Sequence, residues 1–246
     1  MPEKKSTNDP CDRHIMQQAI EKALALGASI AGYVPARLLR GCPSARAEGY
    51  RGWDTFTGTV IVLGLYHDPA RPEMDWWEEG RSTEGDRMLR RMTTAIAEWL
   101  RKEYGRDARD IPYQTGAGGI FLKDAAVLAG LGCIGVNNLV IVPKYGPRVR
   151  FRALWADLEL KDTASVFLPS PCDECPRPCE TACPQNALSG GRYSRERCLR
   201  RMDADRMEAA AKERHSGATS PVDHCRTCDL VCPAWTTPEK KRNARR

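Results

Sequence analysis

The sequence predicts an α+β protein in two parts, with a mixed helix and strand core over residues 1–165 and a cysteine-rich domain over residues 166–246. Helical and strand periodicities alternate up to about residue 160. Eight of the eleven cysteines then lie between Cys172 and Cys232, where aliphatic residues are few. Such a stretch buries too little apolar surface to fold unaided, so bound metal is expected to stabilise it.

Three helices are expected in the first part. Residues 14–26 place Ile15, Ala19, Ala23 and Leu26 on one face, and Gly27 follows as a natural end. Residues 85–104 form a second amphipathic helix that ends at Gly105, and residues 121–129 form a third.

Three strands are also expected, one between the first two helices and two after the third. Residues 59–65 are continuously apolar, which is typical of a buried strand, and residues 139–142 form a short β-branched strand. In residues 149–153 the apolar side chains alternate with Arg150 and Arg152, which predicts a half-exposed strand. No stretch is long enough to span a bilayer and no secretory signal opens the sequence, so we expect a cytoplasmic protein.

The cysteines follow the spacing of bacterial ferredoxins, which bind two [4Fe–4S] clusters. The first run matches C-x2-C-x2-C-x3-C-P with one added residue, Pro-Arg-Pro at 176–178; the second run keeps C-x2-C-x3-C-P, and a lone Cys198 supplies the missing ligand. In this motif the fourth cysteine of a run ligates the other cluster. The predicted ligands are therefore Cys172, Cys175, Cys179 and Cys232 for cluster 1, and Cys183, Cys198, Cys225 and Cys228 for cluster 2.

Two features bear on this assignment. The proline after the fourth cysteine of each run, Pro184 and Pro233, is expected to start a helix, since proline suits the first helical position. Paired zinc sites are the rival interpretation, because C-x2-C pairs also bind zinc. The unbroken four-cysteine run and the two Cys-Pro endings favour iron–sulfur clusters. Cys11, Cys42 and Cys133 lie outside the scheme and are expected to be small, inert apolar residues.

A glycine-rich segment precedes the cysteines. Residues 129–146 read AGLGCIGVNNLVIVPKYG, in which Gly130, Gly132 and Gly135 permit close approach of the backbone to a ligand or another element. The spacing G-x-G-x-x-G is present, but it follows a helix and precedes a strand. A dinucleotide site requires the opposite order, so a nicotinamide cofactor is not favoured.

These motifs carry a family resemblance. AGLG-x-IG-x-N, then KYG, then LWADLEL, then the cysteines in this order resemble the epoxyqueuosine reductases and the cobalamin-binding core of the reductive dehalogenases. The resemblance spans residues 12–236 and is strongest over residues 129–233. It implies a nitroreductase-like α/β core that holds a cobalamin, followed by a ferredoxin-like module whose two [4Fe–4S] clusters feed it electrons. The cofactor-binding residues so implied are Gly130, Gly132, Cys133, Gly135, Asn137, Tyr145 and Gly146.

The sequence also departs from the epoxyqueuosine reductases. Gly116 stands where they carry an aspartate proton donor, and Val136 stands where they carry a lysine. Their C-terminal helical repeat domain, used with transfer RNA, has no counterpart, so the tRNA substrate is not carried over. His67, Tyr113, Asp124 and Tyr145 remain as candidate proton donors, although each is more commonly a packing or surface residue.

Two functions follow as expectations. The first is a cobalamin-dependent reductase, related to epoxyqueuosine reductase, that acts on a small molecule and takes electrons from a ferredoxin or flavodoxin. The alternative is an electron-transfer partner that reactivates the corrinoid of another protein and performs no substrate chemistry. A third, weaker option is a tRNA-modifying reductase, supported only by the basic residues 239–246. Such a tail is more commonly a solvated terminus, and neither nucleic acid nor a membrane is an expected partner.

Overall fold

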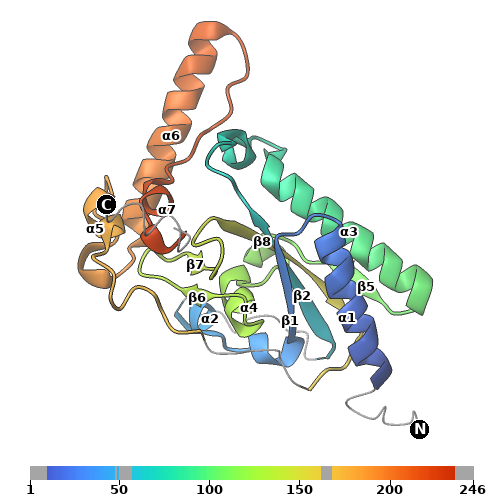
Figure 1. Cartoon of the computed structure of the whole chain (residues 1–246). Coiled ribbons are helices and arrows are strands. Elements are labelled where there is room, and N and C mark those ends of the chain that lie inside the picture. Colours follow the sequence, from blue (N-terminus) through green and yellow to red (C-terminus); the bar gives the residue numbers. More distant parts are fainter. Residues whose placement is uncertain (1–9, 48, 50–56, 162–167, 236–246) are drawn as a thin grey trace. The chain divides into compact units, whose positions relative to one another are not determined.

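The computed structural model describes residues 10–47, 49, 57–161 and 168–235 (Figure 1). The elements in chain order are α1 (Pro10–Ala25), β1 (Ile30–Pro35), η1 (Ala36–Leu39), α2 (Pro43–Ala47), β2 (Thr59–Tyr66), η2 (Pro72–Asp75), β3 (Trp77–Glu78), β4 (Ser82–Thr83), α3 (Glu84–Tyr104), β5 (Ala108–Asp110), η3 (Thr115–Ala117), α4 (Leu122–Leu128), β6 (Cys133–Ile134), β7 (Val140–Ile141), β8 (Val149–Ala156), α5 (Pro178–Ala182), η4 (Ser189–Gly191), α6 (Arg195–Ser216), α7 (Thr227–Leu230) and η5 (Pro233–Trp235). The predicted mixture of helices and strands is confirmed. No helix among the described residues is long and apolar enough to cross a membrane.

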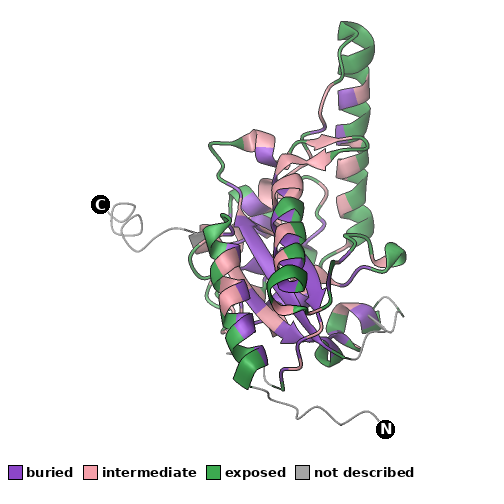
Figure 2. Ribbon diagram, turned by 90° about the vertical axis from the view of Figure 1, so that its right-hand side faces the viewer, coloured by how far each residue is buried: buried purple, intermediate pink, exposed green. Residues whose placement is uncertain are grey.

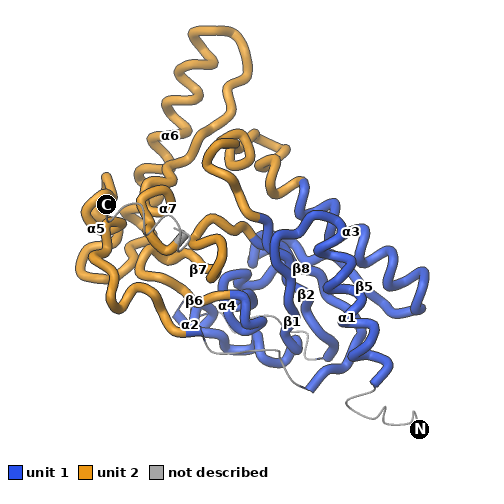
Figure 3. Tube along the Cα trace, in the orientation of Figure 1, with its two compact units in different colours: residues 1–65, 88–131, 151–168 blue, residues 66–87, 132–150, 169–246 orange. Residues whose placement is uncertain are grey.

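The chain forms two compact units that interleave along the sequence (Figure 3). Unit 1 comprises residues 1–65, 88–131 and 151–168, and unit 2 comprises residues 66–87, 132–150 and 169–246. The C-terminal cysteine-rich residues thus group with two segments from earlier in the chain. The expected boundary at residues 165–166 lies outside the described residues, as do residues 239–246 of the basic tail.

Unit 1 contains a four-stranded sheet in the order β1-β2-β8-β5. Strands β1 and β2 are antiparallel with Ile30 opposite Gly64, and β5 and β8 are antiparallel with Ala108 opposite Ala156. The four residues Val60 to Leu63 of β2 are fully buried, as their continuous apolar run predicts (Figure 2). This sheet therefore forms the aliphatic core of unit 1.

The three predicted helices are present as α1, α3 and α4, with ends that follow from local chemistry. The α1 face formed by Ile15, Ala19 and Ala23 is buried. Helix α3 begins after Thr83, whose hydroxyl accepts a 3.1 Å hydrogen bond from the Asp86 N–H and so caps the first turn. It ends at Gly105, which adopts the left-handed backbone conformation with φ of 60°.

The prediction that residues 149–153 form a half-exposed strand is wrong in its exposure. Strand β8 lies between β2 and β5, and Arg152 is only 7% exposed. Its guanidinium lies over the Tyr113 ring, 5.2 Å from the centroid, and donates to the Ile111 carbonyl at 3.5 Å. These partners let an arginine occupy a buried position that the alternating pattern assigned to solvent.

Unit 2 contains two short hairpins, β3–β4 and β6–β7, and the 22-residue helix α6. Helix α6 was not predicted, because it carries charged residues around most of its circumference and buries only Asp205 and Ala209. Its ends nevertheless carry ordinary signals: the Ser194 hydroxyl accepts from the Arg197 N–H, and Gly217 adopts φ of 70°.

The helix expected to start at Pro184 is absent, and Pro184 lies in a turn. Helix α5 begins earlier, at Pro178, and ends before Cys183. The preceding Arg177 adopts a left-handed conformation with φ of 53°. The added residue in Pro-Arg-Pro thus provides a reversal followed by a proline at the first helical position, so the helix forms before the fourth cysteine. After the second run, a 3-10 helix does begin at Pro233, as expected.

Candidate metal centre

The first four predicted cluster ligands lie together within unit 2. Burial, and after it the charges of the neighbouring thiols of Cys172, Cys175 and Cys179, raise the pKa of Cys232 to about 11. Burial and the thiols of Cys172 and Cys175 likewise raise the pKa of Cys179. Residues 172–179 and residue 232, separated by more than fifty positions, therefore place four thiols in mutual electrostatic contact.

The other four predicted ligands form a second set. Burial is the largest cause, and with the charges of Asp229 and of the Cys225, Cys198 and Cys183 thiols it raises the pKa of Cys228 to about 12. All eleven cysteines are free thiols. Because thiols bind iron as thiolates, cluster binding must displace the protons of Cys179, Cys228 and Cys232, whose pKa values are raised.

No group of three or more His, Cys, Asp or Glu among the described residues is arranged to hold a single metal ion. The electrostatic contacts nonetheless place each set of four thiols close together. A site for a single metal ion and a site for a cluster require different arrangements of ligands. Each ligand of a [4Fe–4S] cluster binds a different iron at the outside of a cubane, so the sulfurs need not converge on one point.

Hydrogen bonds from the surrounding chain fix the segments that carry these thiols. The Cys225 N–H donates to Asp205 of α6 at 2.7 Å, and Asp205 in turn forms a 2.6 Å ion pair with Arg201. The Asn137 side-chain amide donates to the Cys228 carbonyl at 3.3 Å, while its oxygen accepts from the Leu139 N–H. Both Asp205 and Asn137 are 5% exposed, so these contacts are shielded from water.

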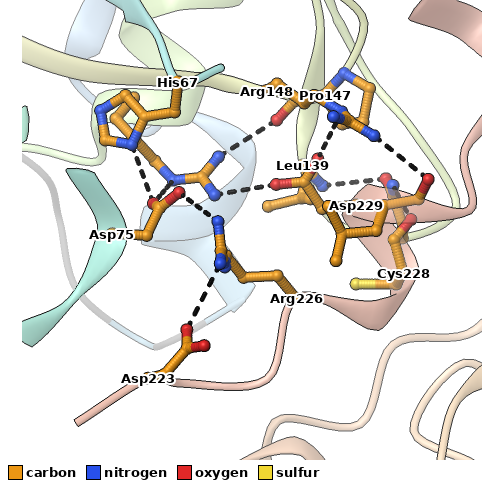
Figure 4. Close-up of polar contacts among 12 residues, drawn as sticks. His67, Asp75, Leu139, Pro147, Arg148, Asp223, Arg226, Cys228 and Asp229 are labelled. Carbon is orange, nitrogen blue, oxygen red and sulfur yellow. Dashed lines mark hydrogen bonds and ion pairs between the residues drawn. The ribbon is translucent and has the colours of Figure 1, made fainter. Parts of the chain in front are cut away.

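A buried network of ion pairs surrounds Asp229, the residue that follows Cys228 (Figure 4). Its carboxylate lies 2.8 Å from Arg150 and 3.5 Å from Arg148, whose side chain is only 4% exposed. Arg148 also donates to the Leu230 carbonyl at 3.1 Å. Arg148, just before β8, and Arg150, within it, thereby bind the second cysteine run through its backbone and through its acidic side chain.

Asp75 is the second acidic centre of this network. It accepts from His67 at 2.9 Å, Arg150 at 3.2 Å and Arg226 at 2.9 Å. Burial opposes ionisation, but the His67 hydrogen bond and the charges of Arg150 and Arg226 outweigh it and hold the pKa of Asp75 well below its ordinary value. His67 is 3% exposed and lies against Gly85, where an added Cβ would be 2.1 Å from its Nε2 atom. Its ring is therefore part of a packed charge network.

The glycines predicted to bind a cofactor have packing roles of their own. A Cβ at Gly132 would lie 2.5 Å from the Ile141 carbonyl oxygen, and one at Gly135 would lie 2.9 Å from the Ile141 side chain. These two glycines let the β6–β7 hairpin close. Gly130 follows α4 with φ of 74°, and Gly146 closes a turn by donating to the Val142 carbonyl. That these residues also bind a cofactor stays a prediction.

The candidate proton donors occupy unlike environments. In unit 1, Tyr113 is 61% exposed, whereas Asp124 is 2% exposed and accepts from the Ser44 N–H at 3.2 Å. In unit 2, Tyr145 stacks on Tyr66 with ring centroids 5.1 Å apart. The roles of Tyr113, Asp124 and Tyr145 in catalysis stay predictions.

The three remaining cysteines also differ from one another. Cys42 is buried, and burial together with Asp124 raises its pKa. Cys133 is half-buried and lies near the Cys172 thiol, whose charge adds to the effect of burial in raising the Cys133 pKa. Cys11 is exposed, so its expected role as an apolar residue does not describe its surroundings.

Several residues that position the thiols were missed from the sequence: Asp75, Arg148, Asp205 and Asp229. Arg150 was treated, with Arg152, as a solvent-facing charge of a strand, and Arg148 was not singled out, although arginines two positions apart in a strand point to the same face. The signal for Asp229 was its place beside a ligand cysteine, where a carboxylate needs a compensating cation if it is buried.

The chain is similar in sequence to curated proteins of one kind. No family model matches the chain. An epoxyqueuosine reductase from Lactococcus garvieae (strain Lg2) is 30% identical over 187 residues, which are 71% of this chain and 51% of that protein. One from Listeria monocytogenes is 31% identical over 116 residues, 46% of this chain and 29% of that protein. The chain thus spans about half the length, or less, of these curated relatives.

Solved structures show the same fold. The structure of epoxyqueuosine reductase from Streptococcus thermophilus superposes with a TM-score of 0.61 at 22% identity, over 89% of this chain and 65% of that one. A reductive dehalogenase described as supporting B12-dependent dehalogenation superposes with a TM-score of 0.62 at 17% identity, over all of this chain and 35% of that one. The resemblance that the sequence motifs predict is therefore confirmed: the curated relatives of this chain are epoxyqueuosine reductases, and its fold is theirs and that of the reductive dehalogenases.

Proposed function

We propose that this protein is an iron–sulfur oxidoreductase in which two [4Fe–4S] clusters supply electrons to a corrinoid for a reductive reaction on a small molecule. The observation that carries this proposal is the ferredoxin spacing of the eight cysteines, and it is supported by the thiols that neighbour Cys232 and Cys228, which come from both cysteine runs and from Cys198. The similarity to epoxyqueuosine reductases supports the reductive class of reaction.

The residues present fit two such clusters. Each set offers four thiols and no competing disulfide. Backbone N–H groups lie beside the ligand sulfurs: the Arg177 N–H donates to Cys175 at 3.4 Å and the Ala187 N–H donates to Cys183 at 3.2 Å. Such hydrogen bonds stabilise the reduced, more negative state and so raise the potential of a cluster. When bound, the clusters would supply one-electron chemistry.

The chain's own part in this function is to hold thiolates in a shielded site. Cys179 and Cys232 are buried, and the others are half-buried. The Asp205 and Asn137 contacts fix the backbone of Cys225 and Cys228, so the thiols of the second set need little rearrangement to bind. The nearby Asp229 carboxylate is balanced by Arg148 and Arg150, which limits its repulsion of the negatively charged cluster.

The corrinoid is proposed from the family resemblance and from the fold shared with reductive dehalogenases. The glycines of residues 130–146 are accounted for by their own packing, so they give no independent support for it. The substrate class and the electron donor, a ferredoxin or flavodoxin, are proposals of the same kind.

Anaerobic reconstitution tests the proposal. The purified chain is loaded with iron and sulfide, assayed for about eight irons per chain, and examined by EPR after reduction. Cob(II)alamin is then added and the visible spectrum is recorded. Bound corrinoid with shifted absorption bands supports the reductase.

Two outcomes contradict it. Normal clusters without corrinoid binding would favour an electron-transfer protein that reactivates another protein's corrinoid. Stoichiometric zinc with no sulfide, from protein prepared anaerobically, would remove the basis of both functions.

A further inference from the structure

The first turns of α6 carry a concentration of positive charge around a predicted cluster ligand. Within residues 192–201 there are five arginines and one glutamate, and Cys198 lies among them. Four of these arginines are exposed: Arg192, Arg195, Arg197 and Arg200. We call residues 192–200 the arginine patch.

Opposing charge is scarce within the patch. Glu196 is its single acidic residue, and it pairs with Arg200 at 2.5 Å with both side chains mostly exposed. An exposed pair of this kind is weak and is readily exchanged for another partner. The fifth arginine, Arg201, is half-buried and turned to Asp205, so it does not contribute to the exposed face.

Two large apolar side chains flank the ligand in the sequence and are exposed. Tyr193 is 39% exposed. Leu199, on the other side of Cys198 in the sequence, is 38% exposed. The patch therefore combines exposed arginines with one aromatic and one aliphatic side chain, a composition that interaction surfaces share.

We propose that the arginine patch is the docking surface for a small acidic one-electron carrier protein, which reduces the cluster held by Cys198. The inference rests on the proposed function, since it requires that cluster. In each encounter the reduced carrier would lose one electron and the oxidised cluster would gain it, with no bond formed or broken. The chemistry of the patch selects the partner: arginines pair with carboxylates, and the partly exposed ligand Cys198 brings the cluster close to the docked carrier.

A nucleic acid would also be attracted to arginines, but two observations favour the carrier. A cluster ligand lies inside the patch, where a redox partner needs it and an RNA does not. The exposed apolar contact comes from one tyrosine and one leucine, rather than from a series of aromatic residues on which bases stack.

The test is binding of flavodoxin to reconstituted protein, measured by calorimetry at low and at moderate salt. The variant Arg192→Glu/Arg200→Glu reverses two charges of the patch and touches no ligand. The matched control, Lys212→Glu/Arg214→Glu, makes the same change in charge at the far end of α6, where both residues are exposed. The milder Arg192→Gln/Arg200→Gln serves if charge reversal impairs folding.

We expect the patch variant to weaken flavodoxin binding by about tenfold or more at low salt, with a smaller difference at higher salt. The glutamine variant should show a smaller loss in the same direction, and the control variant should bind as the wild type does. Iron content and the EPR signal after dithionite reduction should be equal in all of them, because dithionite does not need the docking surface.

Equal binding by all variants, or an equal loss at both ends of α6, would overturn the inference. So would loss of affinity for an RNA stem-loop by the patch variant with flavodoxin binding unchanged. If wild-type protein shows no cluster signal with dithionite, the proposed function itself fails. If the signal is normal and flavodoxin binding does not depend on the patch, only the docking surface fails.

Discussion

The two units of this protein are stabilised by different means. Both units bury polar side chains, but unit 1 surrounds its own with a large apolar core centred on strand β2, whereas unit 2 buries His67, Asn137, Arg148, Asp205 and Asp229 within a much smaller apolar core. Apolar burial in unit 1 is self-sufficient and tolerant of geometry. Buried charges in unit 2 stabilise only when every partner is in place. The stability of unit 2 therefore depends on specific polar contacts and, by our proposal, on its metal.

The largest effect is expected from removing one predicted cluster ligand of unit 2. Cys183→Ala should abolish the cluster assigned to Cys198, Cys225 and Cys228 and leave the other, even though Cys183 is closer in sequence to Cys179. Iron content should fall from about eight to about four per chain, with one EPR signal retained. Loss of the other cluster alone would show that the ligand assignment is wrong.

Removing a buried charge should be nearly as damaging in unit 2. Asp229→Asn leaves Arg148, which is 4% exposed, without its carboxylate, and should cost about 3–5 kcal/mol in the free energy of unfolding. Urea unfolding of reconstituted protein measures this. The matched control is Asp223→Asn, which removes a 56% exposed partner of Arg226 and should cost about 0–1 kcal/mol. Equal losses would mean that the network contributes no more than a surface pair.

A core truncation in unit 1 should lower the free energy of unfolding without changing the iron content of the folded protein. Leu63→Ala empties a fully buried position of β2 and should cost about 2–5 kcal/mol of unfolding free energy. Below the unfolding transition, however, the variant should retain its iron, because Leu63 belongs to the other unit. Loss of iron in the folded variant would contradict the separation of the two stabilising mechanisms.

The smallest expected effect is at Gly116, and a substitution at Gly132 provides the contrast. Gly116, where the epoxyqueuosine reductases carry an aspartate, has no atom within 4 Å of an added Cβ, so Gly116→Asp should change the unfolding free energy by only about 0.5 kcal/mol. Gly132→Ala places a Cβ 2.5 Å from the Ile141 carbonyl and should be clearly destabilising. Thermal melts of the two variants provide the comparison, and a large loss for Gly116→Asp would show that the site cannot accept an acid.

Much of unit 1 could be predicted because its signals are local. The apolar run that became β2 and the apolar face of α1 each specify an element without reference to the rest of the chain. The exposure of β8 could not be predicted in this way, because Arg152 is buried by a ring and a carbonyl that the sequence does not mark as its neighbours.

In the candidate site, too, features with local sequence signals were predicted and features that depend on long-range contacts were not. The pairing of thiols from residues 172–183 with those from residues 225–232 was predicted from motif spacing; in the structure Cys172, Cys175 and Cys179 neighbour Cys232, and Cys183 neighbours Cys228, while the ligand assignment itself stays a prediction. Helix α6 and the roles of Asp75, Asp205 and Asp229 did not follow, since they depend on long-range partners for polar side chains. Even the added residue at 176–178, visible in the sequence as a departure, revealed its effect on α5 only through the Arg177 backbone.

The far end of α6 has a practical consequence. Beyond Ala209 the side chains are almost all exposed as far as Thr219, and the chain is fixed again only where Trp77 and Val222 exchange backbone hydrogen bonds of 2.9 and 2.8 Å. The turn at Gly217 is therefore a suitable position for an inserted peptide tag or an attached fluorophore. A label there would report on the tumbling and encounters of the protein while leaving the thiol-bearing segments undisturbed.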